Sequence, residues 1–397
     1  MALEIFSAAL NKNDLLEKDQ WFGYRTNRAA SDPRVSHIGN PILLTQLPVL
    51  SQMRAAVIKD DESVNYYLDP VNFDKKANGT ASILTGADGQ VMIYKPAYYM
   101  RVDIIGDYVD RKFSLLPLPG YEYKQAYWIG QQLGHINAAG KLCSIHGVMP
   151  TTNKNRDEFR QAARARGSNN WCAYPFEIWE FLNDFFRLKY LTRDSQASAT
   201  LGSGASNASS ADWNTYNAYN PVVACGLKKR LDDVEVPFSV ENWPTSGAGT
   251  LSSQAACLYG IEHVFGQIWQ YLDGLNIHNS TALGSRAFIC TDPANFADDT
   301  ESKYIFAGNL AETGGYISEM IEGSIFPTLT DAGSSTYYCD YHYSIFDTSP
   351  DVGWRGSHVG GYLSTGSSAG LAFSYFIGAA SGRAANVGSR LCLRVPN

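Results

Sequence analysis

RGSHVGGYLSTGSSAGLAFSYFIGAASGRAANVGSRLCL, at residues 355–393, is the stretch on which our interpretation of the fold depends. The 43 residues from Arg355 to Asn397 contain no Trp, Gln, Lys, Glu or Met, although these five types make up 54 of the 397 residues of the chain. At that background frequency about six of them would be expected here, so the composition is informative. Gly, Ser and Ala dominate instead, with scattered His, Tyr, Phe, Ile and Arg.

The missing residue types share a property of the genetic code. If both adenines of an Asn codon, AAC or AAT, are replaced by any base, fifteen residue types become reachable, and the five missing types are the ones such codons never give. The composition therefore indicates adenine-directed mutagenesis. The alternative is a Gly/Ser/Ala-rich pair of terminal strands whose lack of charge is accidental.

Composition also bounds the class of protein. A chain of this length exceeds the usual size of a single core, so one large domain or two unequal domains are expected. The apolar content of 45% and the aromatic content of 13% predict a substantial core and an aromatic-rich surface. The net charge of -7, the isoelectric point near 5.5 and the lack of a Lys/Arg-rich run argue against nucleic acid as a partner.

The N-terminal sequence MALEIFSAALNKNDLLEKDQ has no basic start followed by a long apolar segment, so it does not predict a signal peptide. No apolar run of about 18 residues occurs elsewhere, and membrane insertion is not expected. We expect synthesis in a host cytoplasm. The seven cysteines lie far apart without CxxC spacing, which predicts buried free thiols.

Residues 1–75 form a distinct N-terminal region, which we interpret as an attachment or oligomerisation region. Apolar residues at helical spacing predict one helix within the first twenty residues and another at Leu47–Ile58. The turn signal Asn78-Gly79 lies in a polar segment, so we place the boundary near residue 75 and a second domain at residues 76–397.

Three strands are predicted at Gln90–Tyr94, Tyr98–Ile105 and Tyr108–Leu115 from their β-branched and aromatic content. Helices are predicted at Asp157–Arg166, where acidic residues begin and basic residues end the segment, and at Pro175–Leu191, where a broad apolar band indicates burial. With strands on both sides of these helices and much irregular chain, the pattern predicts an α+β fold. A Ser/Ala/Gly/Asn run at Ser195–Asp212 is expected to be an exposed loop.

Five segments occur in an order that resembles a known family. They are GQVMIYKPAYY (Gly89–Tyr99), EFRQAARARG (Glu158–Gly167), the helix through Tyr190, YGIEHVFGQIWQYLDGLNI (Tyr259–Ile277) and the WRG…AGL…NVGSRL close (Trp354–Leu391). Together they resemble the C-type lectin fold of the formylglycine-generating-enzyme-like variety, as used in the variable proteins of diversity-generating retroelements. The resemblance covers about 300 residues. Most such proteins sit on phage tails or bacterial surfaces.

The resemblance implies a fixed scaffold that displays hypermutated side chains on a ligand face at about residues 355–386. The implied scaffold positions are Trp354, Arg355, Gly356, Ala369, Gly370, Leu371, Asn386, Gly388, Ser389, Arg390 and Leu391. The implied display positions are Ser357, His358, Val359, Tyr362, Ser364, Ser368, Phe373, Tyr375, Phe376, Ile377 and Arg383. Aromatic residues among Ser and Gly also resemble an antibody paratope on physical grounds, since rigid rings give contact area at little entropy cost. Core packing is the alternative for each aromatic residue.

The sequence gives little support to an enzyme. The oxidase chemistry associated with this fold needs a close cysteine pair, and Cys339 and Cys392 are 53 positions apart in the sequence. The seven histidines are dispersed and no HExxH motif occurs, so no zinc site is predicted. We expect no catalytic residue and no cofactor.

Calcium stays open as a ligand, since many lectin folds bind it. The segment Gln267–Gln270 carries amides where the family has Asn and Glu, which lowers its affinity for a hard cation. Acidic groups remain at Asp273 and Asp292. The run Asp298–Glu301 could ligate one ion, or it could be a solvated acidic loop.

We therefore expect a non-catalytic receptor-binding adhesin, located in the virion on a phage tail, whose ligand is a host cell-surface protein or glycan. Several copies on one particle would raise avidity by roughly 100-fold to 10,000-fold, so a homo-oligomer, with a trimer as the leading arrangement, and contacts with other tail proteins are expected. The alternatives are a carbohydrate-binding lectin and a structural virion protein without a receptor role.

Overall fold

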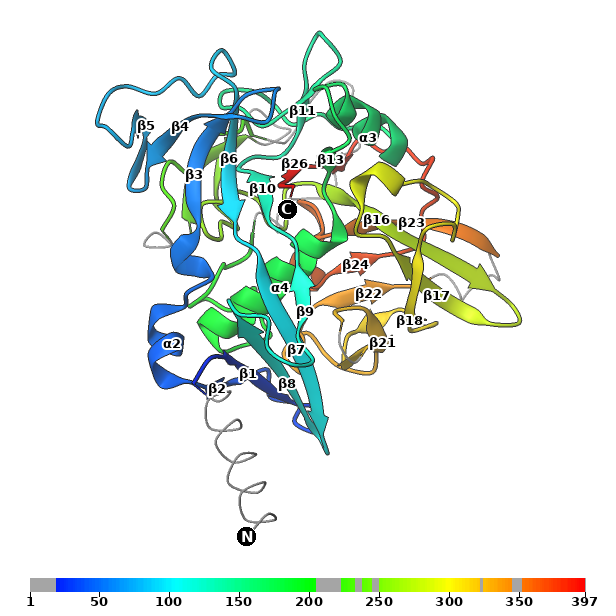
Figure 1. Ribbon diagram of the computed structural model, residues 1–397. Helices are drawn as coiled ribbons and strands as arrows, with labels where there is room; N and C mark the ends of the chain where they lie inside the picture. The colour runs from blue at the N-terminus through cyan, green and yellow to red at the C-terminus, as the bar shows by residue number, and fades with distance from the viewer. Residues whose placement is uncertain are drawn as a thin grey trace.

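The computed structural model describes residues 19–204, 223–232, 238–244, 250–321, 324–344 and 352–396. Strands account for 36% of the described residues and helices for 12%. The described residues contain three α-helices: α2 (Pro41–Gln46), α3 (Arg156–Arg164) and α4 (Phe176–Tyr190). The expected α+β class is therefore wrong, because the fold is β-rich and built from curled sheets (Figure 1).

The first sheet is antiparallel and lies beside α4. Its strands, in spatial order, are β2 (Ser36–Gly39), β1 (Phe22–Asn27), β8 (Tyr108–Ser114), β7 (Tyr98–Ile105) and β9 (Glu122–Lys124). The central sheet joins both ends of the chain. Its strands are β13 (Trp171–Ala173), β26 (Leu391–Arg394), β10 (Tyr127–Gly130), β6 (Gln90–Lys95), β3 (Arg54–Ile58), β4 (Val64–Asp69) and β5 (Asn72–Lys76).

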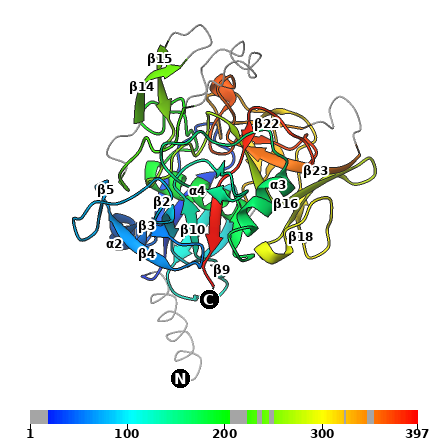
Figure 2. The same cartoon turned by 90° about the horizontal axis from the view of Figure 1, so that it is seen from above.

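The C-terminal sheet carries most of the segment that follows residue 268. Its strands are β18 (Ile305–Asn309), β17 (Gly284–Ile289), β16 (Trp269–Ser280), β23 (Gly353–Val359), β24 (Ser374–Tyr375), β22 (Tyr341–Tyr343) and β19 (Gly315–Tyr316), with β25 (Val387–Gly388) paired to β16. Three hairpins complete the strands: β11 (His135–Ile136) with β12 (Leu142–Cys143), β14 (Phe238–Pro244) with β15 (Thr250–Ala255), and β20 (Glu319–Met320) with β21 (Pro327–Leu329). Short 3-10 turns lie at η1 (Leu50–Gln52), η3 (Pro293–Asn295) and η4 (Gly366–Ser368). Figure 2 shows the β14–β15 hairpin projecting from the body of the molecule.

Helix α4 occupies the centre of the fold, between the sheets (Figure 1). Thirteen of its 15 residues are buried, which confirms the buried helix predicted from its broad apolar band. Toward the first sheet, Phe185 packs against Tyr98 and Phe113 at ring distances of 5.3 and 4.7 Å. On another face, Trp179 lies 6.2 Å from Phe326. The helix therefore forms the packing core that the sheets share.

Several local predictions are confirmed. Strands β6, β7 and β8 lie where the β-branched and aromatic runs predicted them. Helix α3 begins with a capping box in which Asn155 and Glu158 satisfy each other's backbone amides, and it ends with Arg164 in its last turn. Local signals of the backbone therefore agree with the tertiary structure in this part of the chain.

The helix expected at Leu47–Ile58 is wrong. Only the short turn η1 forms there, and the second half is strand β3. The run from Ala55 to Ile58 is buried on both faces, as in a central strand. Because β3 pairs with both β4 and β6, tertiary pairing overrides the helical spacing of the leucines.

Residues 19–75 share sheets and core with the rest of the chain. They supply β1 and β2 to the first sheet and β3 to the central sheet, and Phe22, Val49 and Phe73 belong to the main hydrophobic cluster. The expected boundary near residue 75 therefore does not coincide with a break in the packing. The helix expected in the first twenty residues lies almost wholly outside the described residues.

The exposed loop expected at Ser195–Asp212 lies partly outside the described residues. Its described beginning is packed against the C-terminal region instead of being exposed. Ser195 is buried and its hydroxyl accepts a hydrogen bond from the amide of Leu371, and Gln196 donates to the carbonyl of Gly366. The side chains of Ser195 and Gln196 therefore hold the backbone at the start of η4 and just after it by hydrogen bonds.

Deleting residues 1–75 should prevent folding of the remainder. The deletion removes β3, which pairs with β6 from Arg54 to Ile58, and it leaves unpaired the edge of β8 that β1 occupies. We expect no cooperative thermal transition by circular dichroism, whereas deletion of residues 1–18 should retain one. A cooperative transition in the shorter protein would show that residues 76–397 fold alone.

Candidate ligand-binding surface

The predicted display residues divide into two groups. Five have side chains in the interior: Ser357, His358, Val359, Phe373 and Phe376. The others are partly or fully exposed: Tyr362, Ser364, Ser368, Tyr375, Ile377 and Arg383. The expectation of display therefore fails for the first five, because the second half of β23 is buried on both of its faces. Core packing, the alternative considered for each aromatic residue, holds for Phe373 and Phe376.

The predicted scaffold residues lie mostly in the interior. Gly356, Ala369, Gly370, Leu371, Gly388, Ser389, Arg390 and Leu391 are buried, and Trp354, Arg355 and Asn386 are partly buried. Gly370 shows why one of them is glycine. Its φ is +153°, and a Cβ there would lie 1.9 Å from Oδ1 of Asp340. No larger residue fits without moving the backbone.

Three short strands place tyrosine side chains on one face. In β22, Tyr341 and Tyr343 share one face while His342 between them is buried, as the period of two in a strand requires. His342 and Tyr343 lie opposite Ser374 and Tyr375 of β24, and Tyr316 of β19 lies opposite Tyr341. On the buried side of the paired strands β22 and β24, Nδ1 of His342 and the hydroxyl of Ser374 form a hydrogen bond of 2.8 Å.

These tyrosines form a continuous group that we call the tyrosine surface: Tyr316, Tyr341, Tyr343, Tyr362 and Tyr375. The rings of Tyr316 and Tyr341 are 5.2 Å apart, those of Tyr341 and Tyr343 are 4.7 Å apart, and those of Tyr343 and Tyr375 are 5.6 Å apart. Tyr343 is 38% exposed and the others are partly exposed. Their spacing permits edge-to-face contacts that hold the rings rigidly.

The electrostatics of Tyr343 confirm that the five hydroxyl groups lie close together. Partial burial raises the pKa of Tyr343, and the neighbouring hydroxyls of Tyr341, Tyr362, Tyr375 and Tyr316 raise it further. Burial likewise raises the pKa of Tyr375. Tyr343 and Tyr375 are therefore neutral hydrogen-bonding hydroxyls at physiological pH.

A buried aromatic layer supports the tyrosine surface from below. Trp269 of β16 lies 4.5 Å from the ring of Phe373, 5.6 Å from Tyr375 and 6.2 Å from Tyr362. At the rim, the hydroxyl of Tyr316 is within 3.3 and 3.4 Å of the hydroxyls of Ser367 and Ser368. The surface thus combines aromatic area with small adaptable polar groups on a rigid base.

Three of the five tyrosines were missed by sequence reasoning. Tyr316, Tyr341 and Tyr343 precede the segment at 355–386 and are brought beside it only by strand pairing. The alternation Tyr-His-Tyr at 341–343 was the available signal, since it puts two tyrosines on one face of a strand. Cys339 and His342 in the same stretch are both buried.

Three of the acidic residues considered as calcium ligands, Asp273, Asp292 and Asp298, bind arginines instead, whereas Asp299 and Glu301 are exposed. Arg160 of α3 makes a bidentate pair with Asp273 at 2.8 and 2.9 Å, and Asp298 accepts from Arg156 at 2.7 Å and from Arg160. Asp292 caps η3 and pairs with Arg394. Asp298 is thus part of a buried ionic cluster that fixes α3 to β16, not of a solvated loop. Within the described ranges, no three His, Cys, Asp or Glu side chains are grouped as a metal site would require.

All seven cysteines are free and buried, as predicted. Strand pairing places Cys172 opposite Cys392 in the central sheet, a juxtaposition that their separation in sequence concealed. Burial raises the pKa of both thiols, that of Cys392 to about 12. Both therefore stay protonated and lack the exposed thiolate that redox catalysis uses.

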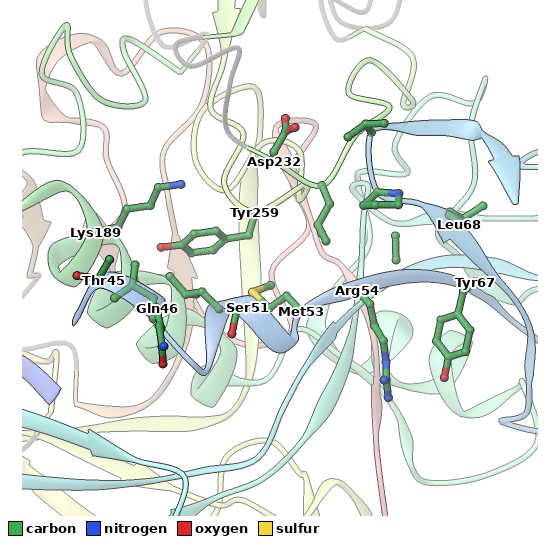
Figure 3. A pocket seen from close by; sticks show the side chains of 16 residues that line it. Thr45, Gln46, Ser51, Met53, Arg54, Tyr67, Leu68, Lys189, Asp232 and Tyr259 are labelled. Carbon is green, nitrogen blue, oxygen red and sulfur yellow. The ribbon is translucent and has the colours of Figure 1, made fainter. Parts of the chain in front are cut away.

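A separate cavity of about 750 Å³ lies between η1, β3, β4 and the segment around Tyr259 (Figure 3). Its charged side chains are already engaged: Arg54 lies over the rings of Tyr67 and Tyr94, and Asp232 binds Arg230. Lys189 lies over the ring of Tyr259. The cavity holds no arrangement of nucleophile, base and oxyanion donor among the residues that line it, so it does not define an active site.

A scan against known protein families finds no match for this chain, and a search of curated protein sequences finds none either. None of the described helices has the length and apolar character needed to cross a membrane.

Replacing Phe373 with Ala should destabilise the fold by about 3–5 kcal/mol, because the ring is fully buried beneath the tyrosine surface. The matched change Tyr343→Ala removes a ring that is 38% exposed and should cost about 1 kcal/mol. Urea denaturation of both variants measures the difference. Equal losses of stability would place Phe373 outside the core.

Acidification should destabilise the protein through His358. Burial lowers the pKa of His358 to about 3, below the ordinary value near 6.5, so the unfolded state takes up the proton first. The contribution of the neutral His358 ring to the free energy of unfolding is complete above pH 6.5. It is lost toward pH 3, by about 1.4 kcal/mol per pH unit. Nε2 of His358 has no hydrogen-bond partner among the described residues, so Phe can replace the ring there. Urea unfolding at pH 7, 6 and 5 should show a shallower decline for His358→Phe, and parallel declines would contradict the assignment.

Proposed function

We propose that this protein is a non-catalytic receptor-binding adhesin and that the tyrosine surface contacts the receptor. The observation that carries the proposal is the group of five neighbouring, partly exposed tyrosines on a rigid aromatic base. Tyrosine gives large amphipathic contact area at little conformational cost, and it is enriched at the energetic centres of protein interfaces. The seryl and glycyl residues around the rings add adaptable hydrogen bonding.

The residue types at 355–397 support diversification of part of this surface, since all of them can be reached from Asn codons by replacing adenines. Tyr362, Ser364, Ser368, Tyr375, Ile377 and Arg383 are reachable by adenine replacement in Asn codons and are at least partly exposed. We include the relationship to the variable proteins of diversity-generating retroelements, a location in the phage tail and assembly as an oligomer in this proposal. Avidity from several copies would compensate for the modest area of a single face.

A neutral carbohydrate is the second candidate ligand. The rings of the tyrosine surface are partly exposed, and the residues that compose the surface carry hydroxyl groups and no acidic or basic side chain. Such a surface suits a pyranose ring, which offers apolar C–H faces and neutral hydroxyls. A protein ligand with an apolar patch fits the same features.

Replacing Tyr341, Tyr343 and Tyr362 together by Ser should reduce adsorption of the purified protein to cells of its bacterial host by roughly 100-fold, because interface aromatics carry most of the binding energy. The control variant replaces Tyr67, Tyr108 and Tyr123 by Ser. These tyrosines are also exposed but lie on the first and central sheets, so this variant should adsorb like the wild type. Labelled protein and whole cells measure the change. Unaltered adsorption of the first variant would rule out this surface as the receptor site.

The gene's surroundings offer an independent check on diversification. We expect a nearby reverse transcriptase gene and a near-copy of the segment that encodes residues 355–386. Sister genes should differ at codons for exposed positions such as Tyr362 and Arg383 and agree at buried positions such as Gly370 and Arg390. Uniform drift along the gene would favour the structural virion protein.

A further inference from the structure

A small cavity lies between the first sheet, the end of α4 and the β20–β21 hairpin. Its volume is about 30 Å³, enough for one or two particles of the size of water. Four arginines line it: Arg28, Arg111, Arg187 and Arg193. Glu319 is the only acidic residue among the described residues of the lining. The cavity is therefore strongly positive unless each guanidinium has its own carboxylate.

Two of the four arginines have carboxylate partners. Nε of Arg111 lies 2.7 Å from Asp184, and Nη2 lies 3.5 Å from Glu180. At the mouth of the cavity, Arg28 lies 3.6 Å from Glu319, and both side chains are about one-third exposed (29% and 34%). These pairs account for the acidic groups that line the cavity or lie directly behind it.

The other two arginines have no carboxylate within 4.0 Å in the described part of the chain. Arg187 is 4% exposed and Arg193 is 2% exposed. Arg187 donates to the side chains of Asn183 and Met320. Arg193 donates through Nη2 to the carbonyls of Ala30 and Asp32, while its Nε and Nη1 have no hydrogen-bond partner among the described residues.

A shared tyrosine ring sets the two unpaired guanidinium groups on one side of the cavity. Arg187 and Arg193 each lie 5.0 Å from the centroid of the Tyr338 ring. Asp184 and Asp340 act on Arg187 only at longer range, and burial raises the pKa of both carboxyl groups. Burial also lowers the pKa of Arg193. Buried charges are normally paired, since leaving one alone in a low-dielectric interior is costly.

We propose that this cavity binds one small monovalent anion, of the size of chloride, between the guanidinium groups of Arg187 and Arg193. The unpartnered Nε and Nη1 of Arg193 supply charge-assisted donors. The partly exposed pair of Arg28 and Glu319 at the mouth gives the ion a route from solvent. The volume of about 30 Å³ selects a halide over sulfate or phosphate. The anion would tie α4, the segment after it and the first sheet together.

Chloride titration at constant ionic strength tests the site, with gluconate as the bulky replacement. For the full chain we expect the melting temperature to rise by roughly 2–4 °C from chloride-free buffer to 300 mM chloride, since a ligand that binds only the folded state stabilises it. Excess line width of the ³⁵Cl resonance should report binding directly. Sulfate stabilises folded proteins by exclusion from their surface, so its effect on the melting temperature should be the same in the wild type and in a variant that lacks the site.

Arg193→Met should abolish both the chloride-dependent rise in melting temperature and the excess ³⁵Cl line width. The substitution removes the unpartnered donors, so chloride binding should weaken by roughly tenfold or more. The control Arg34→Met changes an arginine whose side chain is 83% exposed and should respond like the wild type. If Arg193→Met fails to fold, a bromide-soaked crystal of the wild type gives the answer through anomalous density between Arg187 and Arg193. Absence of that density, or an unchanged chloride response in a folded Arg193→Met protein, would overturn the proposal.

Glu322 follows Ile321 of the lining in sequence and lies outside the described residues. Its carboxylate is the rival to a free anion. If the wild type shows no chloride response and Glu322→Gln acquires one, the site is neutralised internally and the proposal is wrong. If wild type and Glu322→Gln show the same chloride-dependent rise in melting temperature, the free anion is supported, and if neither shows a rise, the proposal is wrong.

Discussion

The structure depends on one buried cation, the guanidinium of Arg390. It donates to the carbonyls of Gly130 and Gln131 at 2.9 and 3.1 Å, to those of Glu262 and His263 at 2.6 and 3.1 Å, and to Oε1 of Gln270 at 3.2 Å. These groups belong to β10, to the buried segment before β16 and to β16 itself. That segment cannot pair as a strand, since Tyr259, His263 and Gln267 all have positive φ, so its carbonyls need donors from elsewhere. A single side chain directly before the last strand, β26, supplies them and thereby fixes the C-terminal sheet to the central sheet.

Helix α4 extends this constraint to the segment beneath the tyrosine surface. Nε1 of Trp179 and the amide of Asn183 both donate to the carbonyl of Leu371, at 2.5 and 3.0 Å, and the buried carboxyl of Asp340 accepts from the amide of Ala372. The backbone of residues 370–372 is therefore held from the interior by side chains that lie far from it in the sequence. Because these contacts use backbone atoms of the loop, exposed side chains on either side of it can change without altering the support. The rigidity of the tyrosine surface follows from the core and not from the identity of the exposed residues.

Local signals predicted the local elements, and tertiary pairing decided the rest. The alternation at Tyr98–Ile105 and the capping residues of α3 were sufficient to place those elements, whereas Leu47–Ile58 carried a helical pattern that the pairing of β3 with β4 and β6 overrides. The fold class was misjudged because many strands of the C-terminal sheet are only two or three residues long, too short to give a periodic signal. The same limit applies to the candidate site. Composition identified the segment at 355–386, but it could not tell that His358 and Phe373 face inward, or that Tyr316, Tyr341 and Tyr343 join the surface through pairing with β22 and β24.

The division of the tyrosine surface between two parts of the chain has a consequence for how such a surface would evolve. Tyr362 and Tyr375 lie within the segment of biased composition at residues 355–397, whereas Tyr316, Tyr341 and Tyr343 precede it. Mutagenesis confined to the segment would therefore change one side of the surface and leave the other constant. The constant rings pack on Phe373 and on each other, so they would keep a minimum of aromatic contact area whatever residues appear beside them. If the proposed function holds, such a surface would retain weak general adhesion while its variable part is replaced, and selection for a new receptor would not begin from zero affinity.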